Sequence, residues 1–131
     1  MNTIIIGIAG GTGSGKTSLA KGILSQYGEG EVAVIEQDSY YNDLSHILYE
    51  ERVIQNYDHP DSIDIELFES HLQGLLNGES VNIPTYDFST HVRMDKTTTI
   101  TPHHVIVVEG ILTLHYTQLR DLFAIKIFVD T

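Results

Sequence analysis

The 131-residue chain contains no cysteine and no tryptophan, and it has no apolar run long enough to cross a bilayer. The absence of cysteine excludes disulfides and thiolate zinc sites, and it suits a cytoplasmic location. The N-terminal residues lack the basic-then-apolar pattern of a secretory signal. We therefore expect no disulfide scaffold and no membrane partner.

Basic residues are also scarce, because seven Lys and Arg face 18 Asp and Glu, for a formal net charge of −11. Nucleic acids require basic surfaces, so this balance excludes them as general partners. The same shortage is unusual for a chain that handles phosphate, since phosphoryl-transfer sites bring several cations to the γ-phosphate. We expect either that most of the few cations are recruited or that part of the machinery is absent.

The chain is organised around a glycine-rich segment, residues 10–17, which fits the pattern G-x-x-x-x-G-K-[ST]. In such a P-loop, glycines let several backbone N–H groups point at one anion, and the following helix presents further N–H groups to it. An apolar run at 3–9 predicts a buried strand before the loop, and apolar spacing over 19–27 predicts a helix after it. This context favours nucleotide binding by Gly10, Gly11, Thr12, Gly13, Ser14, Gly15, Lys16, Thr17 and Ser18.

A second strand is predicted at 31–36, with Asp38 just beyond its carboxyl end. Ligands of open α/β sheets bind at this end of the strands, so we expect Asp38 one strand over from the P-loop. Asp38 could serve as the general base for an acceptor hydroxyl, with a second role near Mg²⁺, or it could cap the next helix. The phosphate loop favours the functional interpretation.

The middle of the chain alternates between weak and strong patterns. Residues 44–55 resemble a weak helix, 56–64 a loop, and 65–77 an amphipathic helix that packs into the core. In the loop, Asp58 could accept hydrogen bonds from a sugar diol, or it could belong to a solvated turn. Two strand-like pieces, 81–88 and 96–101, predict an antiparallel flap, in which Tyr86, Phe88 and His91 either line a pocket for a flat ring or pack across the hairpin.

The last third of the chain supplies two more strands, at 103–110 and 124–130, around a short helix at 115–122. Glu109 ends the first of these strands, where a P-loop protein places an acid on the Mg²⁺ side. Adjacent His103 and His104 are better explained as surface residues than as metal ligands. The elements together predict one α/β domain spanning 1–131, a three-layer, doubly wound parallel sheet of the P-loop NTPase type with a small antiparallel flap.

Six blocks, in order and spacing, resemble the uridine/cytidine kinase family, a branch of the P-loop kinases: GGTGSGKTSLA, QDSYY, NYDHPDSID, IPTYDFSTHVR, VIVVEGIL and LRDLFAIKIFVDT. The resemblance implies transfer of the γ-phosphoryl of ATP or GTP to the 5′-hydroxyl of uridine or cytidine, in pyrimidine salvage. It implies Asp38 and Lys16 as catalytic residues, and Thr17, Glu109 and Asp38 on the Mg²⁺ side. It implies nucleoside contacts from Tyr41, Tyr57, Asp58, Tyr86, Phe88, His91 and Arg93.

The resemblance also implies a homo-oligomer, since the family is often tetrameric, and a longer chain. The family adds a helix, an arginine-bearing lid and a further strand, so we expect 1–131 to be an incomplete domain with impaired turnover. Related kinases, phosphoribulokinase-like or pantothenate kinase-like, are disfavoured because residues 56–93 offer one cation, Arg93, for an anionic acceptor. A non-catalytic nucleotide-binding or regulatory module is the remaining alternative.

Overall fold

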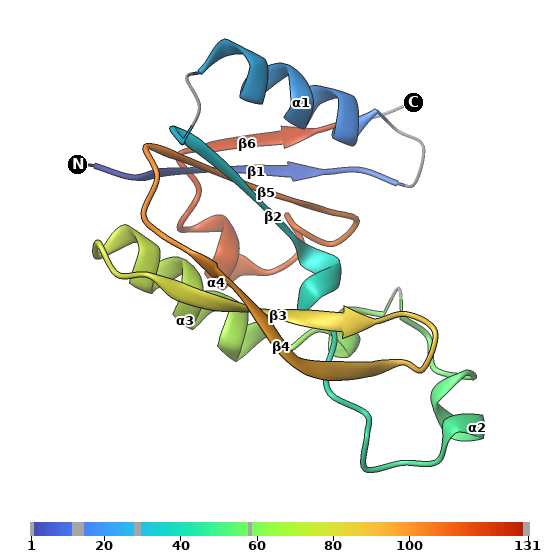
Figure 1. The fold of residues 1–131 in the computed structure, drawn as a ribbon. Helices are drawn as coiled ribbons and strands as arrows, with labels where there is room; N and C mark the ends of the chain where they lie inside the picture. The colour runs from blue at the N-terminus through green and yellow to red at the C-terminus, as the bar shows by residue number, and fades with distance from the viewer. Residues whose placement is uncertain (1, 12–14, 28–29, 58, 130–131) are drawn as a thin grey trace.

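The fold is an α/β layer structure with a separate β-hairpin, and the computed structural model describes residues 2–11, 15–27, 30–57 and 59–129. Four parallel strands form the main sheet in the order β2-β5-β1-β6 (Figure 1). Their bounds are β1 Ile4–Ala9, β2 Val32–Glu36, β5 Val105–Gly110 and β6 Ile125–Phe128. All four carboxyl ends therefore lie at one edge of the sheet.

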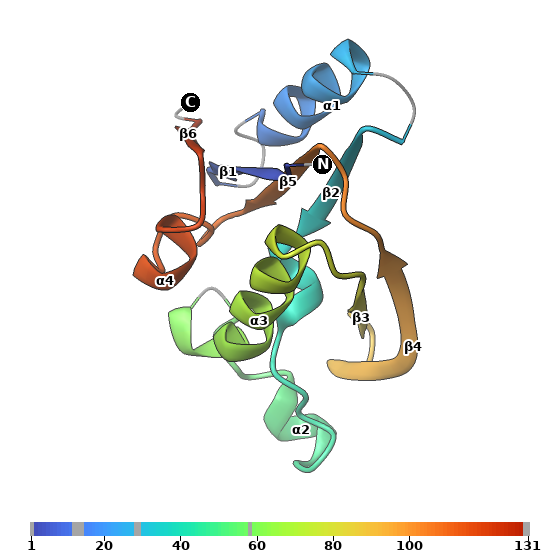
Figure 2. The ribbon, with the colours of Figure 1, turned by 90° about the vertical axis from the view of Figure 1, so that its left-hand side faces the viewer.

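Alternation along the buried strands divides the core between the two faces of the sheet. Ile6, Ile8 and Val107 pack with Ala20 of helix α1 (Lys16–Gln26) on one face. Ile5 and the alternate β5 residues pack on the other face with helices α3 (Ile65–Leu76) and α4 (Thr117–Arg120). Figure 2 shows α1 on one side of the sheet and α3 and α4 on the other. The predicted three-layer, doubly wound arrangement is confirmed.

The predicted flap is also confirmed: β3 (Val81–Asp87) and β4 (Val92–Ile100) form a two-stranded antiparallel hairpin. His91, in the turn between the strands, has a φ of 58°, a left-handed conformation in which histidine is more common than most residues. In the described part of the chain, no helix combines the length and apolarity needed to span a membrane.

Two of the predicted helices are shorter in the structure than the sequence pattern indicates. Of residues 44–55 only α2 (Tyr49–Arg52) is helical, and of 115–122 only α4. Two 3-10 helices also form, η1 at Gln37–Tyr40 and η2 at Pro60–Ser62. The first of them carries Asp38 directly beyond the end of β2, so this segment is a helical turn fixed to the sheet.

Candidate active site

The candidate nucleotide loop joins β1 to α1 at the carboxyl edge of the sheet. Gly15 has a φ of +97°, a conformation that glycine adopts readily and that turns backbone N–H groups toward a bound anion. Lys16 begins α1, an 11-residue helix whose amino end faces the same place. Thr12, Gly13 and Ser14 lie outside the described residues, as do the side chains of Lys16 and Thr17.

Two carboxylates lie at the same edge, on the next two strands. Glu109 is the fifth residue of β5, level with Ile8 of β1 and with Glu36 of β2. Asp38 is two residues beyond Glu36, and both candidate carboxylates are partly buried. Since β5 lies between β1 and β2, the prediction that Asp38 follows the strand next to the P-loop strand is wrong. Glu109 occupies that intermediate place.

Gln37 fixes the turn that carries Asp38 to the end of β5. Its side chain is 2% exposed, and its Oε1 accepts a hydrogen bond from the backbone N–H of Leu112 at 2.6 Å. A Cβ on Gly110 would lie 2.6 Å from this Oε1, so only glycine leaves room for the glutamine. Sequence reasoning did not single out Gln37. Its position beside Asp38 was visible, but its burial was not.

The candidate nucleoside residues form one aromatic cluster, defined as Tyr41, Tyr57, Tyr86, Phe88 and His91. The ring centroids of Tyr41 and Tyr86 are 5.1 Å apart, and those of Tyr86 and Phe88 are 5.2 Å apart. The ring of Tyr57 stacks on that of His91 at 5.0 Å. Burial, together with the neighbouring Tyr57 hydroxyl, raises the pKa of Tyr86. The structure thus brings the rings of residues 41, 57, 86, 88 and 91 together, and their contact with a nucleoside stays a prediction.

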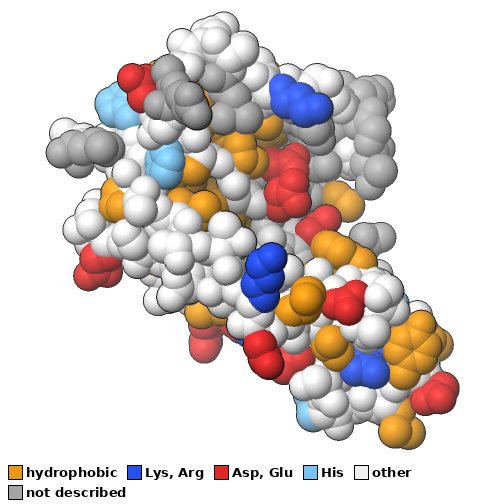
Figure 3. All heavy atoms as spheres, in the orientation of Figure 1, with side chains coloured by type: hydrophobic (Ala, Val, Ile, Leu, Met, Phe, Trp, Pro, Cys, Tyr) orange, Lys and Arg blue, Asp and Glu red, His pale blue; other side chains and the backbone are white. Residues whose placement is uncertain are grey.

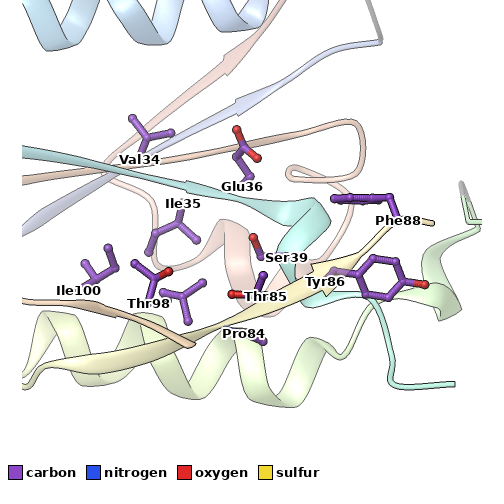
Figure 4. A pocket seen from close by; sticks show the side chains of 11 residues that line it. Val34, Ile35, Glu36, Ser39, Pro84, Thr85, Tyr86, Phe88, Thr98 and Ile100 are labelled. Carbon is purple, nitrogen blue, oxygen red and sulfur yellow. The ribbon is translucent and has the colours of Figure 1, made fainter. Parts of the chain in front are cut away.

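A cavity of about 350 Å³ lies between β2 and the hairpin (Figure 4). Glu36, Ser39, Tyr86 and Phe88 lie toward its end nearest η1, and residues of β2, β3 and β4, mostly apolar with two threonines, line the rest. His91, Tyr41, Tyr57 and Arg93 are not among its lining residues. The cavity is within the size range of small-molecule sites, and it opens beside the turn that carries Asp38.

The loop that precedes α3 is held by its own hydrogen bonds. The hydroxyl of Tyr57 donates to the carbonyl of Arg52 at 2.7 Å, and Ser62 Oγ donates to the carbonyl of Tyr57 at 3.0 Å. The guanidinium of Arg52 lies 5.6 Å from the ring centroid of Tyr49. Asp58 falls outside the described residues, so its predicted diol contact stays a prediction.

Arg93, predicted as a substrate ligand, points one nitrogen at protein acceptors. Its Nη2 lies 3.2 Å from the carbonyl oxygen of Tyr41 and 3.3 Å from Asp64 Oδ2. On the face in Figure 3, Lys and Arg side chains are few and stand apart from one another. This distribution agrees with the net charge of −11.

The residues at the carboxyl edge fit a magnesium ion. Their donors are oxygens, from the carboxylates of Asp38 and Glu109 and from the hydroxyl that Thr17 has by its chemistry. Within the described residues, no three His, Cys, Asp or Glu side chains form a metal-binding group. Mg²⁺ typically uses one or two carboxylates together with water and substrate phosphates, so this donor set suits it.

Comparison with known proteins places this arrangement among kinases. A family model described as "Phosphoribulokinase / Uridine kinase family" matches residues 5–131. Uridine kinase of Clostridium perfringens is 55% identical over 128 residues, and uridine kinase of Streptococcus thermophilus is 51% identical over 128 residues. Each match covers 98% of this chain, but the chain spans only about 62% and 61% of the lengths of these relatives.

A solved structure shares the fold at low sequence identity. The chain described as "Possible Uridine Kinase from Bacillus stearothermophilus" superposes with a TM-score of 0.71 at 20% identity, covering 100% of this chain and 72% of that one. The match supports the parallel sheet with its small antiparallel pair.

Proposed function

Because the chain belongs to the phosphoribulokinase and uridine kinase family, we propose that it forms the nucleotide and acceptor sites of a nucleoside kinase. The reaction transfers the γ-phosphoryl of ATP or GTP to the 5′-hydroxyl of uridine or cytidine. One observation carries the proposal: the β1–α1 junction, Glu109 and the turn that carries Asp38 share one edge of the sheet, and a cavity lined in part by Tyr86 and Phe88 opens beside that turn.

In the proposed reaction, the acceptor 5′-oxygen attacks the γ-phosphorus as the bond from that phosphorus to the β-phosphate oxygen breaks. Asp38 orients the hydroxyl and accepts its proton, and the nucleoside diphosphate leaves. The P-loop amides, the amino end of α1 and Lys16 hold the phosphates in line. Thr17, Glu109 and Asp38 would hold Mg²⁺, which neutralises developing charge on the phosphate oxygens when bound.

The acceptor that fits best is uncharged, with a flat ring. Tyr86 and Phe88 offer aromatic surface to a base, and Asp58 is proposed to accept hydrogen bonds from the ribose diol. An anionic acceptor, such as a sugar phosphate, requires cations in its pocket. The one cation of residues 56–93 is Arg93, and its Nη2 contacts Tyr41 and Asp64.

A panel of acceptors tests the proposal. We expect ATP-dependent ADP release, followed by a coupled assay, with uridine or cytidine, and none above background with ribulose 5-phosphate or pantothenate. Binding of each acceptor, measured by calorimetry, separates recognition from turnover. Uridine that neither binds nor stimulates ADP release would overturn the proposal. A response only to an anionic acceptor would reassign the substrate class.

A further inference from the structure

Arg93 lies in β4, two residues after His91, where the hairpin meets the segment that follows η1. We propose that Arg93 is a positioning residue that fixes the aromatic rings of the hairpin, Tyr86 and Phe88, relative to the turn that carries Asp38. This inference rests on the proposed function and assigns Arg93 a role other than direct contact with the acceptor. Three sets of contacts support it.

The first set joins β4 to the chain just beyond η1. Arg93 Nη2 donates to the carbonyl oxygen of Tyr41 at 3.2 Å, and the backbone N–H of Arg93 donates to Asp43 Oδ1 at 3.4 Å. Burial raises the pKa of Asp43, but hydrogen bonds from Ser45 and Arg93 outweigh this effect and hold that pKa below its ordinary value. The segment after Asp38 is therefore attached to β4 through both the side chain and the backbone of one residue.

The second set joins the same guanidinium to the amino end of α3. Asp64 Oδ2 accepts from Arg93 Nη2 at 3.3 Å, and Asp64 Oδ1 accepts from the backbone N–H of Leu67 at 3.2 Å as the N-cap. The backbone N–H of Asp64 donates to the carbonyl of Tyr40, the last residue of η1, at 2.7 Å. Asp64 thus links the helix, the 3-10 turn and the arginine.

The third set shows what this junction holds in place. Tyr41, whose carbonyl Arg93 binds, places its ring 5.1 Å from Tyr86 and 6.5 Å from Phe88. Tyr41 also pairs with Ile63 in an isolated antiparallel bridge. The junction therefore contacts the aromatic rings through Tyr41 and contacts η1, the turn that carries Asp38, through Asp64. A change at the junction therefore alters the distance between the rings proposed to face the base and the carboxylate of Asp38.

The contacts at this junction depend on the charge of the Arg93 side chain as well as on its length. The side chains of Arg93 and Asp64 are 23% and 32% exposed, so the pair is only partly screened by water. A planar guanidinium directs several N–H groups in fixed directions, whereas a lysine ammonium is a compact point charge. Lysine can therefore replace the charge but only part of the geometry.

The test uses the whole chain and measures uridine and ATP affinity separately by calorimetry, with chemical unfolding in parallel. We expect Arg93→Met to weaken uridine binding at least tenfold and to change ATP binding less than twofold. Arg93→Lys should recover part of the uridine affinity. Asp64→Asn keeps a good N-cap while removing the charge, so it should weaken uridine binding too. The double variant should bind uridine about as weakly as Arg93→Met alone.

Several outcomes would overturn the inference. If Arg93→Met binds uridine as tightly as the unsubstituted chain, the inference fails and the proposed function stands. The same holds if Arg93→Met loses affinity for uridine and ATP equally, in step with a loss of stability. If Arg93→Met does not fold, Arg93→Lys and Asp64→Asn provide the test: each should lose more affinity for uridine than for ATP. Absence of uridine binding in the unsubstituted chain would overturn the proposed function and this inference together.

Discussion

Substituting Gly110 with alanine places a methyl group against a side chain that has nowhere to move. The new Cβ would lie 2.6 Å from Gln37 Oε1 and 2.9 Å from its Cδ, below ordinary contact distance. Gln37 is 2% exposed and cannot turn into solvent. Overpacking costs about 1–3 kcal/mol, and losing the acceptor of the Leu112 N–H costs about 1–3 kcal/mol more. We expect a total loss of about 2–6 kcal/mol.

Chemical unfolding measures this loss, and thermal unfolding should show a fall of about 4 °C per kcal/mol for a chain of this size. Because Gln37 precedes Asp38, Gly110→Ala should also reduce uridine-dependent ADP release by more than its unfolded fraction explains. Gly7→Ala is the matched control, since its Cβ would meet the buried ring of Phe123 at the middle of β1. It should lose stability with little effect on the folded fraction's activity. A Gly110→Ala chain as stable as the unsubstituted one would refute the reasoning.

Gly22→Ala, in the interior of α1 where a Cβ meets nothing within 4 Å, should raise stability by about 0.5–1 kcal/mol in chemical unfolding; a loss would contradict the described helix. Gly15→Ala should weaken ATP binding severalfold by calorimetry and cost about 1–2 kcal/mol, because φ at this position is +97°. Burial, and then the charge of Arg93, lower the pKa of His71, whose Nδ1 lies 2.7 Å from the Tyr40 hydroxyl. The unfolded chain then binds a proton below about pH 6.5 that the folded chain resists, so stability should fall as the pH is lowered from 7 toward 5. His71→Gln should flatten that dependence, and an unchanged slope would contradict it.

The sequence predicts the parts of this fold that depend on local pattern. The continuous apolar runs of β1 and β5 and the apolar stripe of α3 identify their elements because burial selects those residues. The glycines of the P-loop motif predict the turn between β1 and α1 because glycine adopts the conformations that such a loop requires. Asp38 and Glu109 could be placed at the carboxyl edge because parallel strands share one direction. Strand order could not be read in the same way, since the insertion of β5 between β1 and β2 depends on long-range packing.

The contacts that connect the site were also hidden from the sequence. The family resemblance implied a nucleoside contact for Arg93, but its partners Tyr41 and Asp64 lie 52 and 29 residues away in the sequence. In the sequence, Gln37 is an ordinary polar neighbour of Asp38, and only the structure shows that its side chain is buried and bound to the backbone N–H of Leu112. The weak helix at 44–55 contracted to α2 because Leu48, Val53 and Ile54 remain exposed and no apolar stripe is buried there.

The most direct measurement compares uridine-dependent ADP release by the unsubstituted chain and by Asp38→Asn, with ATP and uridine affinities determined for both. A general base contributes about 10²–10⁴-fold, so the asparagine should reduce turnover by at least 100-fold while changing either affinity only slightly. Equal turnover by the two chains would contradict the assignment of Asp38 as the residue that accepts the acceptor's proton.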